Sequence, residues 1–155
     1  MAADKAIDAI DRKILNLLQK DSTLSIASIA ETVGVSQTPC WRRIHRLEEA
    51  GYISGRVALL DAQLLGLKLT AFVVVRTSEH SADWLANFSA ATRAIPEIVE
   101  IHRMSGEMDY LLKVVTEDIE GYDRIYKKLI SKVTLSDVSA SFSMESIKQT
   151  TELPL

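Results

Sequence analysis

The sequence predicts an α+β chain in two parts, a unit of three helices followed by a unit with the element order βαββαβ. Two observations lead to this prediction. Before residue 50, apolar residues recur every three or four positions, which is the period of amphipathic helices. From Leu69 onward, β-branched runs alternate with further helical stretches. We therefore expect a first domain over residues 4–60, a linker at 61–68, a second domain at 69–150 and a tail at 151–155.

Two short amphipathic helices are expected to open the chain. The first ends near Lys20, and its apolar stripe consists of Ile7, Ile10, Ile14, Leu17 and Leu18. The second begins after Ser25, whose hydroxyl can cap a helix N-terminus. Its stripe consists of Ile26, Ile29, Ala30 and Val33. We expect Gly34 to end it, because glycine readily adopts the left-handed conformation found at helix ends.

A third helix is expected to follow at once, with Ser36 as its N-cap. Pro39 lies in its first turn, where a missing N–H costs nothing because those donors have no helical partner. Its buried stripe consists of Cys40, Ile44 and Leu47. Two capped helices joined by a tight turn, with a longer helix before them, form a helix-turn-helix. Residues 52–60 contain an apolar, β-branched run that predicts a small β-hairpin, so we expect the winged form.

The second domain is expected to be a ferredoxin-like antiparallel sheet with both helices on one face. Strands are predicted at 69–76, 98–104, 110–116 and 138–144, and helices at 81–94 and 118–131. Positions expected to face the core include Trp84, Leu85, Phe88, Ile119, Tyr122, Ile125, Tyr126, Phe142 and Met144. The uncovered face would leave apolar residues in water, so two copies are expected to pack sheet against sheet as a homodimer.

Composition narrows the classes of function. The chain has 155 residues, of which 47% are hydrophobic, so an ordinary globular protein is expected rather than a disordered one. We find no run of about 18 apolar residues and no leader, so neither a membrane nor export is expected. The single cysteine, Cys40, excludes an internal disulfide and a thiol–metal cluster, and it fits a reducing cytoplasm.

The third helix carries the chemistry of a DNA-reading surface. The net charge is −3, but Arg42, Arg43 and Arg46 gather three guanidinium groups within five positions. Arginine pairs bidentately with guanine or with phosphate, and glutamine suits adenine. Hydroxyl groups suit phosphate or either base. The candidate contacts to double-stranded DNA are Ser36, Gln37, Thr38, Trp41, Arg42, Arg43 and Arg46. The alternative is a solvated face whose arginines are balanced by Glu48 and Glu49.

Two residues of this helix have a second interpretation. Trp41 is expected to pack against the wing or the first helix, with a DNA contact as its other role. Cys40 is expected to be a small apolar residue of the core. A redox sensor at Cys40 would need an exposed thiol with a lowered pKa.

A turn at residues 104–110 is the distinctive segment of the second domain. Gly106 permits close approach of the backbone to a ligand, and exposed N–H groups there can hold a carboxylate. Asp109 can accept a hydrogen bond from an α-ammonium group, which would complete a small amino-acid site. Its candidate residues are Met104, Gly106, Glu107, Asp109 and Tyr110, with Met104 and Tyr110 as walls. Spacing alone favours an ordinary β-turn in which Asp109 bonds backbone amides.

No catalytic, metal-binding or cofactor-binding constellation is found in the sequence. His45, His80 and His102 lie in three different elements. None of them has a second ligand at the spacing that metal sites need, and the sequence contains no phosphate-binding loop. His102 alternates with core positions and is expected to be structural. An enzyme is suggested by analogy alone, because small ferredoxin-like domains also serve as monooxygenases. We therefore expect a protein that is not an enzyme and needs no cofactor.

Four segments resemble the Lrp/AsnC family, the leucine- and asparagine-responsive or feast/famine regulators. They are IDRKIL at 10–15, SQTPCWRR at 36–43 with LEEAGYI at 47–53, and SGEMDYLL at 105–112. The resemblance implies a sequence-specific transcriptional regulator whose winged helix-turn-helix joins a dimerising βαββαβ domain. It further implies octamers or related rings and an amino-acid effector bound between dimers. It places Gly106, Asp109 and Tyr110 in the effector site, which favours that interpretation of the turn.

Four further segments resemble the members of the family that control cysteine detoxification. They are TPCW at 38–41, VALLD at 57–61, LTAFV at 69–73 and IKQTTELPL at 147–155. This likeness implies L-cysteine as the effector, whereas leucine, methionine and proline serve similar lineages. The alternative function is that of an architectural protein that coats DNA and has no effector. The expected location is the cytoplasm, in association with the nucleoid.

Overall fold

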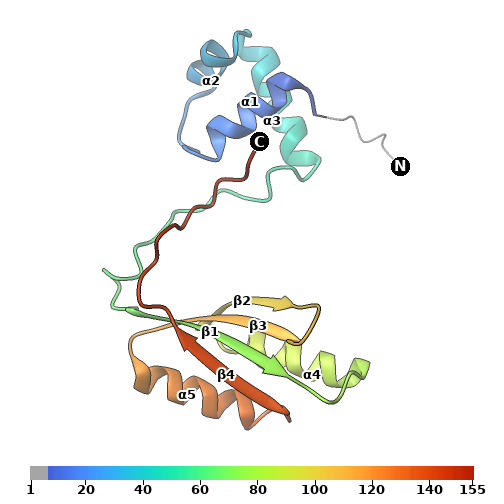
Figure 1. Ribbon diagram of the computed structural model, residues 1–155. Helices are drawn as coiled ribbons and strands as arrows, with labels where there is room; N and C mark the ends of the chain where they lie inside the picture. Colours follow the sequence, from blue (N-terminus) through green and yellow to red (C-terminus); the bar gives the residue numbers. More distant parts are fainter. Residues whose placement is uncertain (1–6) are drawn as a thin grey trace. The chain divides into compact units, whose positions relative to one another are not determined.

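The computed structural model describes residues 7–155, which divide into two compact units (Figure 1). We call residues up to Leu59 together with Lys148–Leu155 the N-terminal unit, and Leu60–Ile147 the C-terminal unit. Residues 4–6, with which the first domain was expected to begin, lie outside the described residues. No helix of the described residues is long and apolar enough to cross a membrane.

The N-terminal unit contains three helices, α1 (Ala9–Leu18), α2 (Ile26–Val33) and α3 (Gln37–Glu49). The predicted cap of α2 is confirmed, because the Ser25 hydroxyl accepts a hydrogen bond from the Ser28 N–H at 3.1 Å. Gly34 ends α2 with φ of +75°, the left-handed conformation expected there. These two residues fix the turn that sets α3 against α2, so the helix-turn-helix prediction is confirmed.

The core of the N-terminal unit is the apolar stripe of each helix. The predicted stripe of α3 is confirmed, because Cys40, Ile44 and Leu47 are all buried. They pack with buried residues from the other two helices, namely Ile14, Leu15, Leu18, Ile29, Ala30 and Val33. Residues 148–155 also belong to this unit. Their link to α1 is the Gln19 side-chain amide, which accepts from the Leu153 N–H at 2.8 Å and donates to the Leu153 carbonyl at 3.0 Å.

The small β-hairpin predicted for residues 52–60 is not formed. Residues 52–68 contain no strand, and Val57, Leu59 and Leu60 are exposed. An isolated two-stranded ribbon is marginal in water unless a further strand or a helix buries one of its faces. The segment instead makes local contacts: the Arg56 guanidinium pairs with Glu48 at 2.8 Å, and Ile53 packs on the core.

The C-terminal unit has the predicted order βαββαβ and a four-stranded sheet. The elements are β1 (Leu69–Arg76), α4 (Ala82–Arg93), β2 (Ile98–Arg103), β3 (Tyr110–Thr116), α5 (Ile119–Ile130) and β4 (Asp137–Phe142). The strand order is β2-β3-β1-β4, and every pair is antiparallel. Both helices lie on one face of the sheet (Figure 1), so the expected ferredoxin-like arrangement is confirmed.

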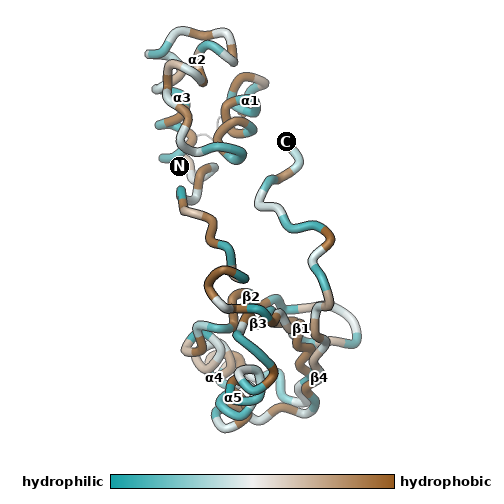
Figure 2. Tube along the Cα trace, turned by 90° about the vertical axis from the view of Figure 1, so that its left-hand side faces the viewer, coloured by the Kyte–Doolittle hydropathy of each residue, from teal (hydrophilic) through white to brown (hydrophobic). Residues whose placement is uncertain are grey.

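The core of the C-terminal unit lies between the sheet and its two helices. Its aromatic centre is formed by Trp84 and Phe88 of α4 with Tyr110 of β3, and the Trp84 and Phe88 rings stack at 5.0 Å. Figure 2 shows brown, apolar residues along the central strands and teal residues over much of α5. Four positions expected in this core are exposed instead: Leu85, Ile119, Phe142 and Met144. Ile119 is the first residue of α5 and Met144 lies beyond β4, so neither is covered by a neighbouring element.

The opposite face of the sheet has no cover within the chain. A strip of apolar side chains crosses it on the two central strands, formed by Phe72, Val74, Leu111 and Val115. Polar residues flank the strip. His102 is among them, paired across from Leu111 on the open face of the sheet. Its ring contacts the Glu100 carboxylate at 3.2 Å, and Glu100 accepts from Lys113 at 2.8 Å.

Candidate functional site

The outward face of α3 is the first candidate site. Its buried stripe is turned toward α1 and α2, which leaves Gln37, Thr38, Trp41, Arg42 and His45 exposed on the other side. Arg42 has no ion pair or hydrogen bond with any residue that the structure describes. A guanidinium group held on a rigid helix and free of protein partners is available to phosphate or to a guanine edge.

The other two arginines of the predicted cluster point elsewhere. Arg43 reaches back to α1, where its Nη1 lies 2.6 Å from an Asp8 oxygen and 2.7 Å from an Asp11 oxygen. Arg46 binds the second oxygen of Asp11 at 2.5 Å. The structure therefore separates Arg42 from Arg43 and Arg46, which fasten α3 to α1. The alternative pairing expected with Glu48 and Glu49 is not found among the described residues.

Asp11 is the centre of this network, which we call the Asp11 clamp (Asp8, Asp11, Arg43 and Arg46). Its side chain is only 1% exposed, whereas those of Arg43 and Arg46 are 28% and 37% exposed. Asp8 caps α1 by accepting from the Asp11 N–H at 2.8 Å, and Asp11 accepts in return from the Asp8 N–H at 3.1 Å. Both oxygens of Asp11 therefore have hydrogen-bonded partners.

The clamp shifts the pKa values of Asp8, Asp11 and Arg43. Burial by itself raises the pKa of Asp11, but the hydrogen bonds from the Asp8 N–H and from the two arginines outweigh it, so the pKa lies below its ordinary value. The pKa of Asp8 is lowered by the Asp11 N–H and then by Arg43. Hydrogen bonds to Asp11 and Asp8 raise the pKa of Arg43. The clamp is therefore fully charged at neutral pH.

Trp41 does not pack against the first helix or the wing as expected. It is 51% exposed, and its indole stacks on the His45 ring with centroids 5.1 Å apart and planes 16° from parallel. His45 lies 3.6 Å from Glu48 and 3.7 Å from Glu49. The sequence did not single out His45 as a site residue. The signal was present, because positions 38, 41, 42 and 45 share the helix side opposite Cys40 and Ile44.

Ser36 stands at the N-cap of α3, but its hydroxyl makes no capping bond. The hydroxyl has no hydrogen-bond partner among the described residues, whereas the Ser36 carbonyl accepts from the Cys40 N–H. The hydroxyl and the first N–H groups of α3 lie together at the positive end of the helix dipole. This end of α3 can therefore donate hydrogen bonds to a phosphate oxygen.

The turn between β2 and β3 is the second candidate site. Gly106 has φ of +102°, a conformation that side chains rarely adopt, so glycine is required there. The turn is closed by the Met104 N–H, which donates to the Asp109 carbonyl at 2.8 Å. One oxygen of the Asp109 carboxylate accepts from the Thr77 N–H at 2.8 Å. Asp109 is thus held in place by Thr77, just after β1, and its other carboxylate oxygen has no partner within residues 7–155.

The remaining members of the predicted effector set divide into two groups. Met104 is half-buried and Glu107 is exposed, and both lie in the turn with Gly106 and Asp109. Tyr110 is buried, with its ring 4.7 Å from Phe88 and 5.7 Å from Trp84. Its ring therefore anchors the start of β3 in the core.

Cys40 is a core residue. Its side chain is fully buried, and burial raises the pKa of the thiol against the smaller, opposing effect of Arg43. A redox sensor needs exposure and a lowered pKa, and neither is present. Within residues 7–155 no group of three or more His, Cys, Asp or Glu side chains is arranged to hold a metal ion.

Two family profiles match the chain and together span most of it. The profile for winged helix-turn-helix DNA-binding domains matches residues 7–54. The profile of the Lrp/AsnC ligand binding domain matches residues 70–153. The first contains the outward face of α3 and the Asp11 clamp, and the second contains the turn at Gly106.

Curated relatives and a solved structure agree with these matches. The glutamate uptake regulatory protein of Zymomonas mobilis is 51% identical over 151 residues, covering 97% of this chain and 92% of that protein. The DNA-binding transcriptional activator DecR of Escherichia coli K12 is 49% identical over 150 residues, covering 96% and 99%. A transcriptional regulator from Neisseria meningitidis, crystallised with L-methionine, superimposes with a TM-score of 0.91 at 34% identity, covering 96% and 97%. These relatives are regulators of transcription, which excludes the monooxygenase alternative.

Proposed function

The chain belongs to the Lrp/AsnC family of DNA-binding transcriptional regulators with an amino-acid-binding domain, and from that premise we propose which residues read DNA and which sense the effector. Arg42 reads the major groove together with Gln37 and Thr38, which lie on the same exposed side of α3. The observation that carries this proposal is the separation of the arginines. The Arg42 guanidinium has no partner in the described part of the chain, while Arg43 and Arg46 are bound to Asp11.

Each exposed residue of α3 has a distinct part in this proposal. Ser36 and the first N–H groups of α3 hold a phosphate and set the depth of the helix in the groove. Trp41, stacked on His45, presents an apolar face beside Arg42 that suits a thymine methyl group. Arg43 and Arg46 act as positioning residues, since they hold α3 against α1 through the Asp11 clamp.

The turn at Gly106 binds the effector, for which we propose L-cysteine. The free oxygen of Asp109 accepts from the α-ammonium group, and the backbone near Gly106 and Glu107 binds the carboxylate. The likeness to DecR and to the cysteine-detoxification segments supports L-cysteine. The complex of the Neisseria relative with L-methionine supports a sulfur-containing amino acid of this size. Leucine, methionine, proline and glutamate are the competing effectors.

Assembly couples the two sites in this proposal. The apolar strip on the open face of the sheet packs against a second copy, and dimers associate further into an octamer. An amino acid held between dimers favours whichever assembly completes its site, because a ligand shifts an equilibrium only through differential affinity. The regulator then works in the cytoplasm on DNA of the nucleoid.

Thermal-shift measurements on the full chain with each of the twenty standard L-amino acids test the effector proposal. We expect L-cysteine, kept reduced, to raise the melting temperature, because a ligand that binds the native state stabilises it. The Asp109→Asn variant should lose this response, since the amide still accepts from the Thr77 N–H but has no charge for an ammonium group.

The matched control is Asp83→Asn, which removes the same charge from an exposed position in the first turn of α4. It should melt like the unaltered chain and keep the full response. A shift with another amino acid that depends on Asp109 would replace L-cysteine with that effector. If no amino acid shifted the melting temperature, or if Asp109→Asn responded normally, the turn would not be the effector site.

A further inference from the structure

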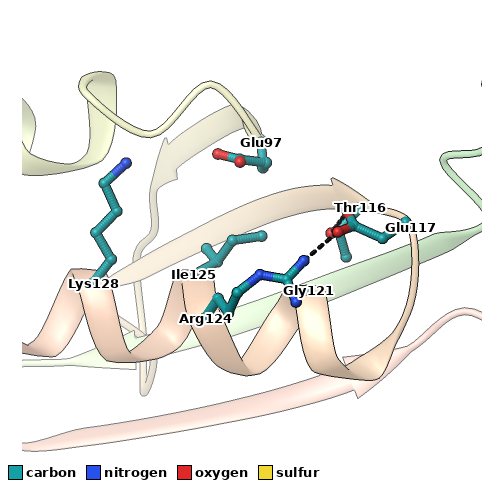
Figure 3. Close-up of a pocket in the computed structure, with 7 residues that line it drawn as sticks. All are labelled: Glu97, Thr116, Glu117, Gly121, Arg124, Ile125 and Lys128. Carbon is teal, nitrogen blue, oxygen red and sulfur yellow. Dashed lines mark hydrogen bonds and ion pairs between the residues drawn. The ribbon is translucent and has the colours of Figure 1, made fainter.

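A small cavity lies at the end of the sheet away from the turn at Gly106 (Figure 3). It has a volume of about 200 Å³ and lies between Glu97, just before β2, the end of β3 and the first half of α5. The strand β3 runs from Tyr110 to Thr116, so its full length separates the two places. We call this space the α5 cavity.

Glu97 brings an unsatisfied acceptor to the α5 cavity. Its Oε2 atom is buried and has no hydrogen-bond partner among the described residues. Burying a carboxylate oxygen without a partner is costly, and native proteins rarely leave one so. Lys128 lines the same cavity, and its ammonium group likewise has no ion pair or hydrogen bond with a described residue. Figure 3 shows the Glu97 carboxylate and the Lys128 side chain reaching to the same side of α5, with space between them.

The other charged groups of the α5 cavity are already paired with one another. The Arg124 guanidinium binds the Glu117 carboxylate, and the Thr116 hydroxyl donates to Glu117 at 2.8 Å. Gly121 allows this packing, because a Cβ atom there would lie 2.4 Å from the Thr116 hydroxyl oxygen. What remains for a ligand is therefore one carboxylate oxygen, one ammonium group and the apolar side chain of Ile125.

We propose that the α5 cavity binds a small zwitterion, a molecule with one ammonium and one carboxylate group on a short carbon skeleton. Its ammonium donates to Glu97 Oε2, its carboxylate accepts from Lys128, and its carbon atoms contact Ile125. The volume suits a ligand of about six non-hydrogen atoms, taking about 30 Å³ for each water-sized group. L-alanine has this size and both charges. The site is separate from the proposed effector turn and does not depend on it.

Spectra of the full chain with labelled isoleucine methyl groups test this site, because Ile125 reports from inside the cavity. Titration with L-alanine should move the Ile125 signal to saturation, both in the unaltered chain and in Asp109→Asn. Methylammonium and acetate carry one of the two charges each and should bind at least about tenfold more weakly. Glu97→Gln and Lys128→Gln should each weaken L-alanine binding by about tenfold.

Lys127→Gln is the matched control, since Lys127 is the neighbouring lysine of α5 but pairs with Asp123 and does not line the cavity. It should bind L-alanine as tightly as the unaltered chain. An Ile125 signal that stays in place throughout the titration would overturn the proposal. So would a shift that disappears in Asp109→Asn but survives in Glu97→Gln and Lys128→Gln, because the effector turn would then be its origin.

Discussion

Replacement of Asp11 by alanine should lower the free energy of unfolding of the N-terminal unit by about 3 kcal/mol, the low end of the range for breaking a buried ion pair from one side. Asp11 is buried and binds two arginines, so its loss leaves Arg46 without this partner and Arg43 with Asp8 alone. The reciprocal cap of α1 also loses one of its two bonds. Calorimetry of the full chain should show the N-terminal unit melting on the order of ten degrees lower.

Asp21→Ala is the control for this experiment. Asp21 is exposed and bonds only its neighbour Thr23, so removal of the same charge there should change stability by about 0.5 kcal/mol or less. The double variant Asp11→Ala with Arg46→Met should regain part of the loss, because Arg46 has lost its partner in Asp11→Ala whereas Arg43 keeps its ion pair with Asp8. If Asp11→Ala melted like Asp21→Ala, the clamp would make no contribution to the fold of this unit.

Acid should act on the same clamp. The pKa values of Asp8 and Asp11 are lowered in the folded chain, so their stabilisation is complete above the ordinary aspartate pKa of about 3.9 and is lost as pH falls through the folded values. The N-terminal unit should therefore lose stability below about pH 4. In Asp11→Ala this dependence on pH should be shallower, because one of the two groups no longer titrates.

Replacement of Arg42 by alanine should lower the affinity for promoter DNA by about tenfold for each recognition helix, without lowering the melting temperature. Arg42 is exposed and has no partner in the described chain, so its removal breaks no internal contact. In a dimer both copies of α3 lose one contact, so the slope of log affinity against log salt should become shallower by about two. Fluorescence anisotropy titrations over a range of salt concentrations measure both quantities.

Two other arginines complete the comparison. Arg12→Ala removes the same charge from the exposed side of α1 and should leave both the affinity and its salt slope nearly unchanged. Arg43→Ala should lower the melting temperature, unlike Arg42→Ala, because Arg43 bridges Asp8 and Asp11. Should Arg42→Ala bind DNA as Arg12→Ala does, the outward face of α3 would not be the reading surface.

The parts of the fold that the sequence predicted well are those set by local rules. The caps at Ser25 and Gly34 depend on neighbouring residues alone. The element order βαββαβ follows from the periodicity of the apolar residues. The winged class is confirmed by the family match, but the hairpin predicted in the wing is not formed. A β-branched run forms a ribbon only where another surface buries it, and Val57, Leu59 and Leu60 lie exposed.

The parts of the site that the sequence did not resolve depend on which charges meet in space. Arg42, Arg43 and Arg46 look alike in sequence, and only Asp11 separates them. One signal was available: Asp11 falls four residues after Ile7 and three before Ile14, on the apolar stripe of α1. A charged residue on such a stripe indicates a buried ion pair. Nothing comparable marks the burial of Tyr110, because a tyrosine suits both a ligand wall and an aromatic core.

Selection of binding sites from a pool of random DNA by the purified full-length chain would separate a reader of sequence from a protein that coats DNA. With α3 in the major groove and the chain assembled as a dimer, the recovered fragments should share a near-palindromic motif. Its half-sites should lie roughly 34 Å apart, about one helical turn. Arg42→Ala should recover a motif that is relaxed at the bases this residue contacts. Recovery of fragments without any shared motif, by a chain that still binds DNA, would contradict the reading surface and leave an architectural role.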